Sequence, residues 1–291
     1  MRAMLLAVPL LIVSASDLSL TVRPGEAVPF TVEKTEGVAL VDPGQPPRPE
    51  LSPDFVRRSG ITGGRAGELS IVGPVIVKGG FKRVGIDMAG RRFFRTVEWF
   101  GVPHPSGADA VIGPASLPFD VIRFDLGRPV PGERAVDLPL TDFSDEGQRL
   151  GTVLVLGRSP VRIFFTLARK ETLATAGAGT AIAAAHGGHL LGDLRPTPIA
   201  HGVTRPTRTM RLDHPLAVGP VSIRSLSVRV ADYGHTRIAS GERVDPAEVV
   251  VSKRIKRDPR NDWMLLGRDA LRGCSSLVMN KRRKLLTLSC R

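Results

Sequence analysis

Three kinds of residue are scarce in this 291-residue sequence: aromatic residues, cysteine and acidic residues. Aromatic residues make up 5% of the chain, and 28 acidic residues stand against 41 Lys and Arg, for a formal charge of +13. A basic chain suggests an anionic partner, but the basic runs at residues 253–260 and 281–284 lack interleaved aromatic side chains on which bases could stack. We therefore predict no nucleic-acid partner. An anionic envelope polymer is the partner that better fits the basic surface.

Cysteine occurs only twice, at Cys274 and Cys290. Two apolar runs flank a polar turn at residues 280–284, so the segment predicts a β-hairpin with the two cysteines opposite each other near its open end. In an oxidising compartment this pair would close into a disulfide, and two buried free thiols are the alternative. His186 and His189 are separated by two glycines and have no Cys or paired carboxylate to complete a shell, so we predict no metal site.

Long apolar runs are also missing. The longest lies at residues 4–13, follows Arg2 and precedes small residues, which is typical of a secretory signal cleaved after Ala15. It is too short to span a bilayer as a helix, so we expect no transmembrane segment in the mature chain. An N-terminal core strand in a cytosolic protein is the alternative. With the disulfide, a signal peptide at residues 1–15 predicts a periplasmic or secreted protein.

Glycine and proline, by contrast, are plentiful, and they set the fold class. The chain has 31 Gly and 24 Pro, and its short Val, Ile and Leu runs are bounded by Gly-Pro, Pro-Gly and Gly-Gly pairs. Short apolar runs between such turn signals favour many short strands. We predict a mainly β protein with few short helices.

An approximate internal repeat divides the chain. The first half reads "VALVDPG", a short helix at residues 52–60 and later "VIG"; the second reads "TLATAGAG", a helix at residues 181–188 and later "LLG". Such repetition predicts two lobes of one design, at residues 16–126 and 150–291. Residues 127–149, rich in proline and charge, are predicted to link them.

These motifs resemble those of aspartic proteases of the pepsin and retropepsin type. Asp42, Pro43 and Gly44 match the Asp-Thr/Ser-Gly corner at its Asp and Gly, and the two hydrophobic-hydrophobic-Gly segments match the family's second motif: Val111, Ile112, Gly113, Leu265, Leu266 and Gly267. The resemblance implies a bilobal pair of β-barrel lobes with a central cleft that takes a peptide or protein substrate. It also implies that each apolar-Gly segment packs behind its corner and that residues 77–85 form a Gly-rich flap. No cofactor is implied.

The chemistry of this family needs two carboxylates that share one proton. Aligning the halves places Thr175 opposite Asp42, Ala176 opposite Pro43 and Gly177 opposite Gly44, so the second carboxylate is missing. A threonine hydroxyl is no general acid or base near neutral pH. Asp42 is also what a simple turn needs, since its side chain can accept backbone N–H bonds.

We therefore predict an exported pseudoenzyme that is inactive or binds a peptide or polymer. One alternative is an active aspartic endopeptidase that uses Asp42 with a second acid from Asp142, Asp145 or Asp193. The other is a basic structural protein that binds the envelope.

Overall fold

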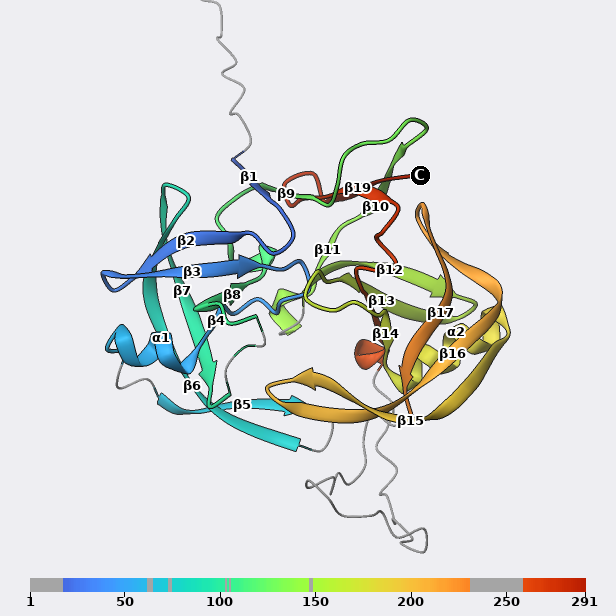
Figure 1. Ribbon diagram of the computed structural model, residues 1–291, viewed down its shortest axis with the longest axis horizontal. Coiled ribbons are helices and arrows are strands. Elements are labelled where there is room, and N and C mark those ends of the chain that lie inside the picture. The colour runs from blue at the N-terminus through green and yellow to red at the C-terminus, as the bar shows by residue number, and fades with distance from the viewer. Residues whose placement is uncertain are drawn as a thin grey trace, which may run out of the picture.

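The computed structural model describes residues 18–61, 65–72, 75–102, 104, 106–146, 149–230 and 259–291 (Figure 1). The chain is mainly β, as predicted. Its described part has two α-helices, α1 (Pro53–Arg58) and α2 (Ala176–His186), and three 3₁₀-helices, η1 (Pro114–Ser116), η2 (Ser144–Glu146) and η3 (Pro259–Asn261). No helix in these ranges has the length and apolar character needed to cross a membrane. The predicted signal peptide, residues 1–15, lies outside the described residues.

A seven-stranded sheet holds most of the first half of the chain. Its strands, in spatial order, are β2 (Ala27–Val32), β3 (Thr35–Val41), β8 (Ala110–Ile112), β4 (Glu50–Leu51), β7 (Arg91–Phe100), β6 (Val75–Met88) and β5 (Arg65–Val72). Strand β2 also pairs with β6, which closes six of these strands into a barrel. Val32, Ile86 and Val97 are fully buried in its apolar core. The predicted flap residues 77–85 lie within β6, and the turn between β5 and β6 falls outside the described residues.

An eight-stranded sheet in the second half repeats this order. It runs β11 (Thr141–Asp142), β12 (Leu150–Leu156), β13 (Ser159–Phe165), β18 (Trp263–Leu266), β14 (Leu173–Ala174), β17 (Val221–Arg229), β16 (Val203–Val218) and β15 (Gly188–Ala200). From β12 onward each strand corresponds to the strand at the same place in the seven-stranded sheet. The parallel pair β3–β8 has its counterpart in β13–β18, and β4 has its counterpart in β14. The internal repeat is therefore a repeat of strand order.

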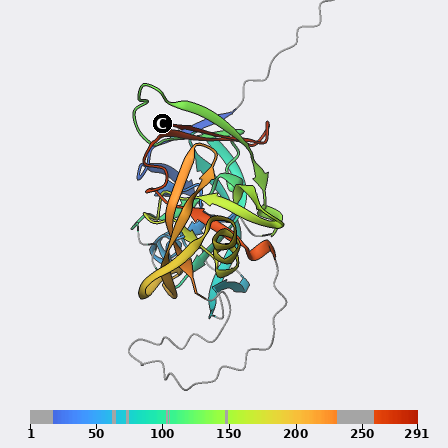
Figure 2. The same ribbon diagram turned by 90° about the vertical axis from the view of Figure 1, so that its right-hand side faces the viewer.

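A third sheet joins the two halves at one end of the molecule, as both views show (Figures 1 and 2). Its order is β1 (Ser19–Val22), β9 (Val121–Asp125), β19 (Cys274–Asn280), β20 (Leu285–Cys290) and β10 (Arg134–Pro139). Residues 127–149 are thus more than a linker. They contribute β10 to this sheet and β11 to the eight-stranded sheet.

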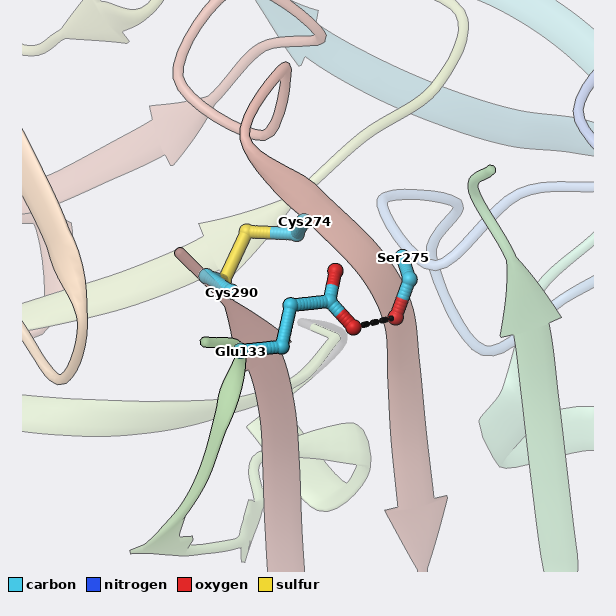
Figure 3. Close-up of a disulfide and its surroundings, with 4 residues drawn as sticks. All are labelled: Glu133, Cys274, Ser275 and Cys290. Atoms are coloured by element: carbon cyan, nitrogen blue, oxygen red, sulfur yellow. Dashed lines mark hydrogen bonds between the residues drawn. A yellow bond between two sulfur atoms is a disulfide. The ribbon is translucent and has the colours of Figure 1, made fainter. Parts of the chain in front are cut away.

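The cysteine hairpin forms as predicted. Strands β19 and β20 pair in antiparallel register with Cys274 opposite Cys290, and the two sulfur atoms are 1.99 Å apart, a disulfide (Figure 3). Beside the bridge, the Ser275 hydroxyl donates a hydrogen bond to Glu133 Oε2 at 2.8 Å. Glu133 immediately precedes β10, so this contact and the β10–β20 pairing tie the central segment to the disulfide hairpin.

Candidate functional site

Asp42 lies at the C-terminal end of β3, where the chain leaves the barrel. Its N–H donates to Ile112 O of β8 at 3.1 Å, and a turn follows in which Gln45 N–H donates to Asp42 O at 3.1 Å. Gly44 N–H donates to Asp42 Oδ2 at 3.0 Å. The carboxylate therefore caps its own turn, which is the structural role expected of an Asp in this position.

Both apolar-Gly segments pack behind a chain corner. A Cβ atom at Gly113 would lie 2.4 Å from Gln45 O, and one at Gly267 would lie 2.4 Å from Lys170 O. Gly44 is as tightly enclosed, because a Cβ there would lie 2.7 Å from Phe165 O. Each of these positions needs glycine since backbone approaches too closely for a side chain.

The corner that meets Asp42 comes from the end of β13. Thr166 N–H donates to Leu266 O at 2.9 Å, as Asp42 N–H does to the equivalent strand of the first half. Thr166 Oγ1 donates to Asp42 Oδ2 at 2.9 Å, and the N–H groups of Leu167 and Ala168 donate to Asp42 Oδ1 at 2.6 and 3.1 Å. The carboxylate thus joins the two corners directly.

The structure places Thr166 against Asp42, where the sequence alignment had placed Thr175. Thr175 is instead the N-cap of α2, where its Oγ1 accepts a hydrogen bond from Ala178 N at 3.4 Å, and that oxygen also accepts from Trp263 N at 3.1 Å. Ala176 and Gly177, predicted as turn residues, are the first residues of the helix. The counterpart of Thr175 in the first half is Ser52, whose hydroxyl caps α1.

The Asp42 side chain is buried, with 6% of its surface exposed. Burial raises the pKa of Asp42 above its ordinary value, while the hydrogen bonds from Leu167, Thr166, Ala168 and Gly44 oppose the rise. Four donors fill both carboxylate oxygens. Among the described residues no other acid shares a hydrogen bond with them, so the proton-sharing pair of a hydrolytic dyad is absent here.

A half-buried arginine from the end of the central segment completes the corner. Arg149 Nε–H donates to Gly44 O, and its guanidinium carbon lies 5.7 Å from the ring centroid of Phe164 and 6.0 Å from that of Trp263. Burial lowers the pKa of Arg149 to about 10, and the nearby charge of Asp42 opposes this shift. At neutral pH the site therefore holds a cation beside the carboxylate.

Further titratable side chains surround the Asp42 corner. Gln45 Nε2 donates to Glu50 Oε2 at 3.5 Å, and Glu50 Oε1 lies 3.3 Å from His201 Nδ1. Burial lowers the pKa of His104, the charge of His201 adds to this shift, and the charges of Glu50 and Asp42 oppose it. Sequence reasoning missed Glu50, His104 and His201, because only the fold brings β4, the loop after β7 and the β15–β16 turn together.

The acids named as possible partners of Asp42 lie on the surface. Asp142, Asp145 and Asp193 are exposed, and Asp142 Oδ1 accepts a hydrogen bond from Ser144 N at 2.8 Å. The described residues contain no group of three His, Cys, Asp or Glu side chains able to hold a metal ion. His189 Nε2 contacts Asp213 Oδ2 at 3.0 Å instead.

Comparison with known proteins adds no relative. Scans of the chain against protein-family models and against curated protein sequences find no match.

Proposed function

We propose that this chain is an exported aspartic-protease-like protein with an incomplete dyad, which binds a peptide or polymer without hydrolysing it by the two-carboxylate mechanism. The observation that supports this is the Thr166 hydroxyl bonded to Asp42 Oδ2 at the corner where the family would place its second acid. A hydroxyl can donate a hydrogen bond to Asp42, but it cannot activate a water with it near neutral pH.

The matching strand orders of the two halves support the family resemblance. Each half has a hairpin, a polar corner residue, a helix capped by Ser or Thr, and a parallel strand that ends in an apolar-Gly step. Under this proposal the halves are two barrel lobes, and peptide would bind in a cleft between them at the Asp42 corner. The disulfide and the expected signal peptide fit a periplasmic or secreted location.

Peptidase assays on purified protein test the inactive assignment. The wild type is incubated with denatured casein at acid pH beside the Asp42→Asn variant, and we expect the same absence of cleavage from both. Cleavage by the wild type that Asp42→Asn abolishes would overturn the proposal in favour of an active endopeptidase. Asp42-dependent binding of a transition-state mimic of the statine class would point the same way.

Thr166→Asp tests the position of the missing acid. The variant places a second carboxylate beside Asp42, where the two can share a proton at acid pH. We expect Thr166→Asp to gain casein cleavage that the double variant Thr166→Asp/Asp42→Asn lacks, and the isosteric Thr166→Asn is the matched control. A folded Thr166→Asp protein without activity would show that Thr166 does not stand where the second acid belongs.

A second candidate, binding of an anionic envelope polymer, is favoured by a cluster of three cations. Burial and the neighbouring charge of Arg83 lower the pKa of Arg95. Burial and the charge of Arg95 lower the pKa of Lys281, while the charges of Asp120 and Asp142 oppose that shift. An anion would relieve this repulsion. Binding would appear as sedimentation with envelope polymers that salt abolishes, without any peptide binding.

A further inference from the structure

The hairpin formed by β15 and β16 reaches from the second half of the chain toward the first (Figure 1). Its turn residues His201 and Gly202 have φ angles of +49° and +75°. Positive φ at both central positions is typical of tight hairpin turns that favour Asn-Gly or Gly-Gly. A non-glycine residue with positive φ is uncommon, and His201 is held in this turn by contacts of its side chain.

The His201 side chain is held by two residues of the seven-stranded sheet. Its ring centroid lies 3.8 Å from that of Phe100 at an interplanar angle of 38°, and its Nδ1 lies 3.3 Å from Glu50 Oε1. Only 9% of the His201 side chain is exposed. The aromatic ring covers one face of the imidazole, and the carboxylate lies within ion-pair distance of its edge, although Nδ1 makes no hydrogen bond there.

The residues that receive His201 are positioned by the first half alone. Glu50 belongs to β4, which pairs with both β7 and β8, and its other oxygen accepts a hydrogen bond from Gln45. Phe100 is 2% exposed and packs against Gly79, where a Cβ would lie 2.7 Å from its ring. The contacts of this site would therefore stay in place if His201 left it.

The surroundings of the site supply a charge that fits the ligand. Phe100 also lines a surface hollow of about 410 Å³ together with Trp99 and Gly80. The Glu50 carboxylate carries a negative charge next to His201, and it faces the second imidazole, His104, electrostatically. A cationic or hydrogen-bonding heteroaromatic group suits this environment.

We propose that Glu50 and Phe100 form a binding site for an imidazole group, and that His201 occupies it as a ligand supplied by the chain itself. A partner peptide that presents a histidine side chain would compete with the hairpin for the same site. The hairpin is thus an intramolecular blocker. This inference goes beyond the proposed function and holds whether or not Asp42 binds peptide.

A second contact holds the hairpin near the site independently of His201. The Arg169 guanidinium, three residues after Thr166, donates a hydrogen bond to Pro198 O of β15. Replacing His201 with glycine therefore leaves one anchor in place and suits the positive φ of the turn. His201→Gly is accordingly the variant that empties the site with least disturbance to the backbone.

The test is an imidazole titration followed by ¹H–¹⁵N NMR. We expect saturable shifts at the amides of Glu50 and Phe100 in His201→Gly and none in the wild type at the same concentrations. His201→Gly/Glu50→Gln should bind imidazole about tenfold more weakly, because the carboxylate partner is lost. His189→Gly removes a 67% exposed histidine from the same hairpin and is the matched control, expected to bind no imidazole.

Two results would overturn the proposal. One is a folded His201→Gly protein with no saturable shifts, and the other is equal affinity in the single and double variants. If His201→Gly does not fold, amide exchange at the β15–β16 turn of the wild type is followed against imidazole concentration. Faster exchange as imidazole competes supports the proposal, and exchange that imidazole does not alter contradicts it.

Discussion

Replacing Asp42 should lower the free energy of unfolding far more than replacing an acid on the surface, because the Asp42 carboxylate accepts hydrogen bonds from four donors. Asp42→Ala leaves the buried N–H of Gly44, the part-buried N–H groups of Leu167 and Ala168 and the Thr166 hydroxyl without their acceptor. At the lower end of about 1 kcal/mol for each orphaned donor, the free energy of unfolding should fall by about 4 kcal/mol. Asp42→Asn keeps one acceptor oxygen, and the Thr166 hydroxyl can rotate to accept from the new amide. It should cost about 1–3 kcal/mol, the penalty of one orphaned N–H.

Urea denaturation at pH 7 measures both variants, with Asp193→Ala as a control in which an exposed acid is removed. We expect Asp193→Ala to stay within about 0.5 kcal/mol of the wild type. A loss of less than about 1 kcal/mol in Asp42→Ala would mean that these hydrogen bonds contribute little to the stability of the fold. An acid kept for catalysis often leaves stability unchanged or improved when removed, so such a result would favour an enzyme.

Comparing the stability of the wild type and of Asp42→Asn across pH isolates the charge of Asp42. Burial raises the pKa of Asp42 in the folded chain above the ordinary 3.8. Between pH 3.8 and that raised pKa, the folded chain therefore holds a proton that the unfolded chain has released. The stability gained from this is present below pH 3.8 and is lost as pH rises through the folded pKa. Asp42→Asn cannot ionise. The stability advantage of the wild type over Asp42→Asn should therefore shrink from pH 4 toward pH 7.

Two further predictions concern the disulfide and His104. Replacing Cys274 and Cys290 with serine removes a cross-link between residues that are 16 positions apart. The free energy of unfolding, measured in urea, should fall by about 3 kcal/mol. A wild type that keeps its stability in reducing agent would contradict this prediction. Burial lowers the pKa of His104 below 6.5, so below this pH the unfolded chain binds a proton before the folded chain does. The free energy of unfolding should therefore fall as pH drops from about 6.5 through the pKa of His104 in the folded chain. His104→Gln should weaken that fall in denaturation curves at pH 7.5, 6.5 and 5.5, and an unchanged slope would assign it to other groups.

Local patterns in the sequence were enough to predict several elements. The hairpin of β19 and β20 follows from two apolar runs around a polar turn, and the short helix α1 from Ser52 and Pro53 before Phe55. The mainly β class follows from the density of turn residues. Each of these depends on neighbours in the chain, which a single sequence displays directly.

The residues that meet Asp42 from the second half were not predicted, because they do not look like the first corner. "TAG" at residues 175–177 resembles the family corner in letters, while the corner that meets Asp42 reads "TLA" at residues 166–168 and has no glycine. The strands that precede the two corners do share features that indicate their equivalence. β3 and β13 are both second strands of a hairpin, both have 7 residues, and both end directly before a polar residue. The contact itself spans 124 positions and depends on tertiary packing, which no local pattern contains.

The contacts of Asp42 also explain why this corner suits a structural anchor better than half of a dyad. A catalytic acid has to give up and take back a proton, so its two protonation states must be close in free energy. Here burial raises the pKa of Asp42 although four hydrogen-bond donors oppose the rise, and all four partners are donors rather than a second acid that could share the proton. Three of these donors, the Thr166 hydroxyl and the N–H groups of Leu167 and Ala168, belong to the opposite half. The Asp42 side chain is therefore part of the junction between the two halves.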